Sequence, residues 1–202
     1  MILTQAILKE AEKWLGCTET TRHRSDCIDE IHRQFSAGWN GSPDAWCAKF
    51  VWTMTETATK KLGIPNPLHK SASTVQMLNK TDLRKDDIPA RGAIFFISRV
   101  CSGGGSGCGH VGFVEKVDGN FIHTLEGNTG GPAGVYRKKR NITSQKFTFI
   151  HIEDLDTLKN NLLAPLQFEL DLIFADPRTF ITTGIIITGG VISWKLYKNY
   201  KL

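Results

Sequence analysis

The chain has 202 residues, of which 41% are hydrophobic and 22% are charged. These proportions are typical of a globular chain and exclude wholesale disorder and a collagen-like fibre. The length predicts one domain, or one domain with a short appendage, and allows a core that needs no disulfide bonds. The formal net charge of +5 favours an anionic partner such as a cell-wall polymer, an acidic membrane or a nucleic acid, without choosing among them.

The first part of the chain is predicted to be helical. Residues 4–15 carry apolar side chains at helical spacing and are followed by Gly16, which predicts an amphipathic helix with a glycine stop. Ser25 or Asp26 is expected to cap a second helix. The residues at 38–43 are rich in glycine, asparagine, serine and proline, and they predict a loop before the next helix.

The third predicted helix is the most regular. Its apolar residues repeat at steps of three and four over positions 46–62, and Gly63 is expected to end it. Asp44 is expected to cap its start, so that Cys47 lies in the first turn. A shorter helix is predicted over residues 71–78.

After Pro89 the apolar residues take the spacing of strands. Five strands are predicted, over residues 93–98, 110–117, 120–126, 135–139 and 146–152. The tight turn Asp118-Gly119 joins the second and third strands into a hairpin, and a glycine-rich segment at 101–108 precedes the second. Helices followed by strands predict an α+β fold, with N-terminal helices packed on an antiparallel β-meander.

The chain contains five cysteines, namely Cys17, Cys27, Cys47, Cys101 and Cys108. We expect all of them to be reduced, as in a cytosolic protein; the alternative pairs the first with the second and the fourth with the fifth, and leaves Cys47 over. A zinc site that adds His23 and His32 to the first two cysteines has spacings that match no standard finger. Neither a metal nor a cofactor is predicted.

Four residues are candidates for catalysis. Cys47 lies where a helix N-terminus lowers the pKa of a thiol and makes it a better nucleophile. His110 opens a strand and is the candidate base. Glu126 ends the partner strand of the same hairpin, so its side chain is expected to neighbour the histidine and fix its tautomer. Asn128 follows two residues later, within reach of the histidine or of a substrate oxyanion.

Four segments, in this order, resemble the CHAP family of cysteine- and histidine-dependent amidohydrolases and peptidases. They are PDAWCAKFV at 43–51, GHVGFV at 109–114, EGNT at 126–129 and GVYR at 134–137. The resemblance implies a papain-like fold and hydrolysis of an amide in bacterial peptidoglycan. The scissile bond is either the one between muramic acid and the first alanine or one within the peptide.

The resemblance also implies the roles of the site residues. Cys47 attacks to form an acyl-enzyme, His110 acts as base and acid, Glu126 and Asn128 orient the histidine, and the Cys47 backbone amide helps to bind the oxyanion. The D-x-D calcium loop that some members carry before the cysteine helix is missing from this sequence, so no calcium is expected.

Other features bear on the substrate and on rival functions. Trp39 and Trp46 are candidates to line a substrate groove, although tryptophans often belong to the core. The charge run at 137–140 is expected to be a solvated face that attracts an anionic wall. One rival is a papain-like peptidase or acyl transferase acting on protein, and another is an inactive, membrane-anchored wall-binding or virion protein. No nucleic-acid partner is expected.

The C-terminal part of the chain carries an apolar run, FITTGIIITGGVISW at 180–194, between charged residues. Its length is close to the shortest that spans a bilayer. The alternative is a C-terminal hairpin that is either buried or bound at the surface. The predicted organisation is a catalytic domain at 1–155, a linker at 156–178, a membrane-spanning or membrane-associated segment at 179–197 and a basic tail at 198–202. Since the N-terminus lacks the pattern of a cleaved signal, we expect a membrane- or virion-associated protein that acts at the cell wall.

Overall fold

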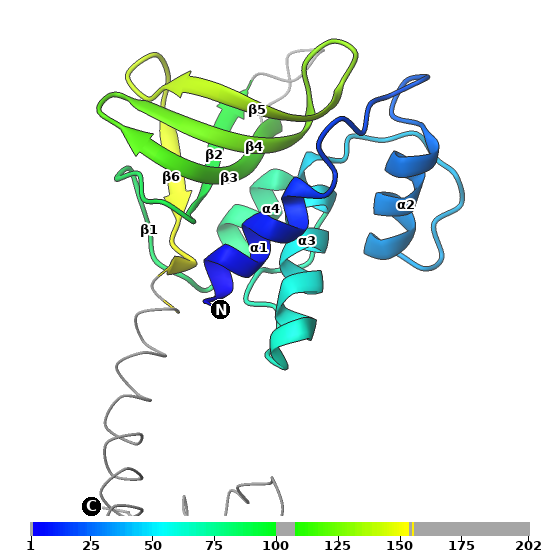
Figure 1. Ribbon diagram of the computed structural model, residues 1–202, viewed down its shortest axis with the longest axis horizontal. Helices are drawn as coiled ribbons and strands as arrows, with labels where there is room; N and C mark the ends of the chain where they lie inside the picture. The colour runs from blue at the N-terminus through cyan, green and yellow to red at the C-terminus, as the bar shows by residue number, and fades with distance from the viewer. Residues whose placement is uncertain (1, 100–107, 154, 156–202) are drawn as a thin grey trace, which may run out of the picture. The chain divides into compact units, whose positions relative to one another are not determined.

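Four helices and a six-stranded sheet form the part of the chain that the structure describes (Figure 1). The helices are α1 (Leu3–Glu12), α2 (Asp26–Phe35), α3 (Cys47–Leu62) and α4 (Thr74–Lys80). The strands are β1 (Lys85–Asp86), β2 (Ile94–Arg99), β3 (Cys108–Asp118), β4 (Phe121–Thr129), β5 (Gly134–Asn141) and β6 (Phe147–Ile150). This order confirms the predicted α+β class.

The computed structural model describes residues 2–99, 108–153 and 155, which belong to one compact unit. The predicted linker, membrane segment and basic tail lie outside the described residues, as does Cys101. Within the described ranges, no helix combines the length and the apolar character needed to cross a bilayer.

The sheet is antiparallel throughout, with the order β1-β6-β2-β3-β4-β5. The predicted meander is correct for β2 to β5. It is wrong for the last strand, because β6 does not follow β5 in the sheet but lies between β1 and β2 and pairs with both. An aromatic contact supports this position, since the ring of Phe147 on β6 lies 6.0 Å from the ring of Phe95 on β2.

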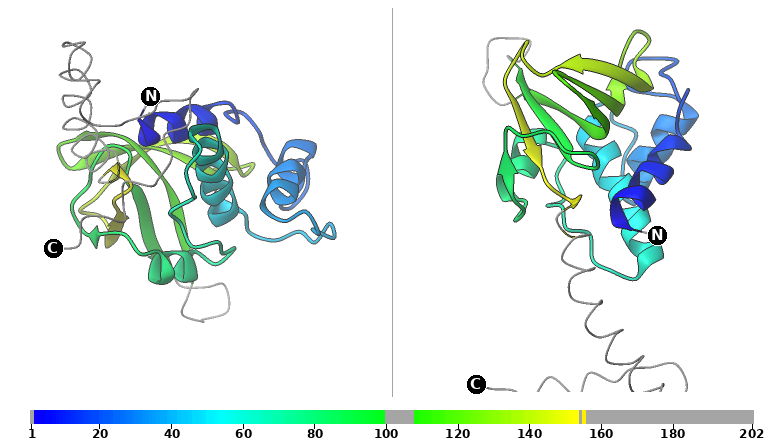
Figure 2. Two further views of the ribbon diagram at one scale, coloured as in Figure 1. Left: turned by 90° about the horizontal axis from the view of Figure 1, so that it is seen from below. Right: turned by 60° about the vertical axis from the view of Figure 1, so that its left-hand side comes forward.

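Helices α1, α3 and α4 lie on one side of the sheet (Figures 1 and 2). Alternation along the strands explains this packing: Val111 and Phe113 of β3 join the helices in one core, whereas Val114 belongs to a second apolar cluster with Phe95 and Ile122. The first core fixes α3 against β3 and β4, which is where the predicted site residues lie.

The helix boundaries match the predicted signals in part. Ser25 caps α2 by accepting from the backbone N–H of Ile28, and Gly63 ends α3 with a φ of 67°. The prediction that Asp44 caps α3 is wrong, because that helix begins only at Cys47. The Asp44 carboxylate instead accepts from the Nζ atom of the buried Lys49, at 2.7 and 2.8 Å.

Cys17 and Cys27 form a disulfide between the α1–α2 connection and the start of α2. The expectation of five reduced thiols is therefore wrong. The chain reverses between the two helices and brings the two Cα atoms to 6.0 Å, a separation that a disulfide can bridge. Cys47 is buried and takes no part in this disulfide, as the alternative pairing predicted.

Replacing both Cys17 and Cys27 by serine is expected to lower the free energy of unfolding by about 3 kcal/mol. The bond joins residues ten apart in sequence, and its loss gives that loop back its freedom in the unfolded chain. Urea unfolding of the variant and the wild type without reductant measures the difference. Wild-type protein under reductant is the control and should match the variant, whereas equal midpoints without reductant would contradict the expectation.

Candidate active site

Cys47 is the first residue of α3, and its side chain is only 5% exposed. The N-terminal turn of this helix rests directly on the sheet. A Cβ atom placed on Gly127 of β4 would lie 2.7 Å from ring atoms of both Trp46 and Phe50. The ring of Phe50 also meets Phe113 of β3 edge-on, with the centroids 6.2 Å apart. Cys47 therefore lies at the junction of α3 with β3 and β4.

His110 and Glu126 form a buried pair on the sheet. The register between β3 and β4 ends at the Phe113–Leu125 pair, and the two side chains lie just beyond it. His110 Nε2 is 2.7 Å from Glu126 Oε2, and the two residues are 3% and 0% exposed. The contact expected from the hairpin is confirmed.

Burial by itself would raise the pKa of Glu126, yet hydrogen bonds from Arg140 and His110 outweigh it and hold the pKa at about 2. Arg140 donates from Nε to Oε1 and from Nη2 to Oε2, each at 2.5 Å, and the Thr124 hydroxyl also donates to Oε1. An ionised carboxylate only accepts hydrogen bonds, so Nε2 of His110 carries the proton. The lone pair of the neutral imidazole is then on Nδ1, which is the atom able to act as a base.

Arg140 and Thr124 were not among the predicted site residues. Arg140 belongs to the charge run at 137–140, which was expected to be solvated, whereas its guanidinium is directed at a buried carboxylate. The pairing of β4 with β5 places Arg140 opposite Ile122, and this pairing could have indicated the inward direction of the Arg140 side chain. Ile122 faces the same side of β4 as Glu126, since side chains alternate along a strand.

The remaining candidates lie apart from this pair or within the core. Asn128 lies within a bulge of β4, between Glu126 and Thr129, has a φ of 61° and is half-buried; its orienting role stays a prediction. Trp46 is fully buried and donates from Nε1 to Glu19 at 3.1 Å, so it has no exposed surface to offer a substrate. The half-buried Trp39 stacks on His32, with the ring centroids 4.6 Å apart. The imidazole of His32 therefore covers part of the indole ring that was expected to contact a substrate.

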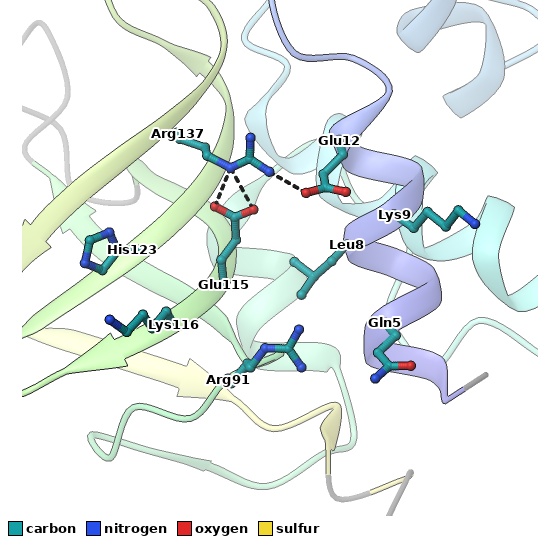
Figure 3. A pocket seen from close by; sticks show the side chains of 9 residues that line it. All are labelled: Gln5, Leu8, Lys9, Glu12, Arg91, Glu115, Lys116, His123 and Arg137. Carbon is teal, nitrogen blue, oxygen red and sulfur yellow. Dashed lines mark hydrogen bonds and ion pairs between the residues drawn. The ribbon is translucent and has the colours of Figure 1, made fainter.

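An open pocket of about 600 Å³ lies elsewhere, between α1 and the strands β3 to β5 (Figure 3). Arg137 connects its two sides, with Nε 3.0 Å from the carboxylate of Glu115 and Nη2 on Glu12. Its lining, labelled in Figure 3, includes none of the predicted site residues.

Replacing Gly127 by alanine is expected to lower the free energy of unfolding by about 1–3 kcal/mol and to reduce activity. The added methyl would displace the rings of Trp46 and Phe50, and with them the first turn of α3. Gly38→Ala is the matched control, because a Cβ there meets nothing within 4 Å. Urea unfolding of both variants checks this, and equal stability for the two would contradict the close packing of α3 on β4.

Comparison with known proteins adds the family. The model of the CHAP domain family matches residues 37–128. Among solved structures, the chain is similar to Ly7917, with 16% identity over 73% of this chain and 62% of that one, at a TM-score of 0.38. It is also similar to an N-acetylmuramoyl-L-alanine amidase from Staphylococcus aureus, with 20% identity over 66% of this chain and 34% of that one, at a TM-score of 0.37.

The chain thus spans less than two thirds of the length of either of these proteins. None of the curated proteins compared with it matches the sequence. The family match, in contrast, includes all four predicted catalytic residues, which are Cys47, His110, Glu126 and Asn128. The matched segment, residues 37–128, is similar to CHAP domains and makes up somewhat less than half of the chain.

Proposed function

We propose that this chain is a peptidoglycan hydrolase that cleaves an amide bond, with Cys47 as nucleophile and His110 as base. The observation that carries the proposal is the buried His110–Glu126 pair on the strands against which the first turn of α3 packs. A cysteine at a helix start, a histidine and a group that holds the histidine are the parts that thiol-dependent acyl transfer needs. All of them lie within the segment that matches the CHAP family, and the action on peptidoglycan follows from the resemblance to that family.

The proposed reaction has two halves. In the first, Nδ1 of His110 takes the Sγ proton, the Cys47 thiolate attacks the amide carbon, and the imidazolium protonates the leaving amine. The product is a thioester between Cys47 and the acyl part of the substrate. In the second, Nδ1 takes a proton from water, the hydroxide attacks the thioester, and the acid and the thiol are released.

Two features of the site support this sequence of steps. The N-terminus of α3 provides the positive end of a helix dipole, which favours both the thiolate and the developing oxyanion. The ionised Glu126 holds the Nε2 proton and stabilises the imidazolium that forms. The scissile bond is either the muramoyl–alanine amide or an amide of the peptide, and the place of action that we propose is the cell wall.

Digestion of purified peptidoglycan by the full chain tests the proposal. Mass spectrometry of the released fragments should find new amino ends without new reducing sugar ends, and the residue at each new end names the bond. The Cys47→Ala variant is the control and should release nothing. Failure to release fragments from several wall chemotypes, or equal release by the variant, would refute the proposed function.

A further inference from the structure

The Glu126 carboxylate accepts hydrogen bonds not only from His110 but also from Arg140 and Thr124. Oε2 is shared by His110 and Nη2 of Arg140, while Oε1 is shared by Nε of Arg140 and the Thr124 hydroxyl. The carboxylate is fully buried, and the Arg140 side chain is only 15% exposed. Paired contacts of this kind from a planar guanidinium fix both the position and the orientation of a carboxylate.

Arg140 also reaches the histidine by a second route. Its guanidinium carbon lies 5.3 Å from the ring centroid of Phe95 on β2, and that ring lies 5.9 Å from the ring of His110. Arg140 therefore contacts both groups that hold the imidazole, although it comes from β5 and lies beyond the matched segment 37–128.

The positive charge of Arg140 has an electrostatic role beside the buried Glu126 carboxylate. The charged groups of this cluster are Glu126 of β4, which bonds to His110, and Arg140 of β5, which bonds to Glu126, while β2 contributes the Phe95 ring. Cys47 at the start of α3 is the further ionisable group that the proposed reaction brings to the histidine. A buried carboxylate without a second cation would strongly favour the imidazolium. The imidazolium would then be a weaker acid and would pass its proton less readily to a leaving amine.

We propose that Arg140 is a positioning residue of this site, which holds the Glu126 carboxylate on Nε2 of His110 and offsets its negative charge. The inference deepens the proposed function and rests on it for the role in catalysis. Arg140 is not proposed to touch the substrate or the reacting atoms, and it acts through the groups that hold the histidine, chiefly Glu126.

The first test compares the pH dependence of kcat/KM for peptidoglycan cleavage in four full-length proteins. They are the wild type, Arg140→Gln, Arg140→Lys and Lys139→Gln, the last of which removes a positive charge from the exposed neighbour on the same strand. Arg140→Gln should lower kcat by about 10-fold or more, leave KM nearly unchanged and move the alkaline limb to higher pH. Arg140→Lys should restore part of the rate, and Lys139→Gln should keep the alkaline limb of the wild type.

A rate loss in Arg140→Gln that is the same at every pH, with no recovery in Arg140→Lys, would overturn the inference and leave Arg140 a structural role only. So would unchanged kinetics in a folded Arg140→Gln. If Arg140→Gln fails to fold, Arg140→Lys tests the inference instead. Arg140→Lys should keep part of the rate, with the alkaline limb of its pH profile displaced. Kinetics equal to those of the wild type would count against the inference.

The second test needs no activity and separates this inference from the proposed function. NMR titration of the His110 imidazole, assigned with a His110→Gln variant, should show its pKa about one pH unit higher in Arg140→Gln than in the wild type. That shift in a protein that cleaves no peptidoglycan would refute the proposed function and still support the link from Arg140 to His110. An unchanged titration would overturn the link, whatever the activity.

Discussion

Cys47→Ala is expected to lower the rate of amide cleavage by about 1,000-fold or more, because no other group can form the thioester. The fold should survive the change. Cys47 is a small buried side chain at the first position of α3, and removal of one sulfur atom costs on the order of 1 kcal/mol. Peptidoglycan digestion and thermal unfolding of the same preparation measure the two effects separately.

Cys47→Ser is the matched control for geometry. A hydroxyl fills nearly the same space, but it is far less acidic than a thiol and should leave the rate close to that of the alanine variant. If either variant kept a rate within tenfold of the wild type while properly folded, Cys47 would not be the nucleophile.

Glu126→Gln is expected to lower both stability and activity. The wild-type carboxylate has a pKa of about 2, below its ordinary 4.5, so it contributes stability above pH 4.5 that is lost as the pH falls towards 2. That shift corresponds to stabilisation on the order of 3 kcal/mol near neutral pH. A glutamine leaves Arg140 without its counter-charge and can present an N–H to Nε2, so the rate should fall by about 100-fold or more.

Unfolding in urea between pH 2 and pH 7 is the measurement, and the gap between wild type and variant should close at the acid end. Glu115→Gln is the matched control, because Glu115 also pairs with an arginine of β5, at 3.0 Å from Arg137, but at the surface. The Glu115→Gln change should lower the free energy of unfolding by less than about 1 kcal/mol. A stability gap for Glu126→Gln that does not change with pH would contradict the buried ion pair.

Features that depend on local chain chemistry could be predicted from the sequence. Ser25 caps α2 and Gly63 ends α3 because each satisfies backbone groups of the adjacent turn. The hairpin that brings His110 and Glu126 together was also predictable from its tight turn, but their contact depends in addition on a bulge between Val114 and Lys116, which shifts the register by one residue. These features supply the start of the candidate site and the orientation of its histidine.

Features that depend on distant parts of the chain could not be predicted in the same way. The return of β6 to a place between β1 and β2 is supported by the packing of Phe147 against Phe95, which has no local sequence signal. Asp44 has the residue type of a helix cap, but its carboxylate pairs with Lys49 instead. The role of Arg140 depends on the pairing of β4 with β5, because only that pairing carries its guanidinium to Glu126.

Alkylation of Cys47 by iodoacetamide tests whether Cys47 and His110 act as a nucleophile and its base. The rate is followed by peptide mapping across pH 4–10 in the wild type and in His110→Ala. We expect rapid labelling of Cys47 at mildly acidic pH in the wild type, and loss of that labelling in the variant, because the histidine stabilises the thiolate. Labelling of Cys47 that rises only near pH 8.5 in both proteins, as for an ordinary thiol, would contradict it.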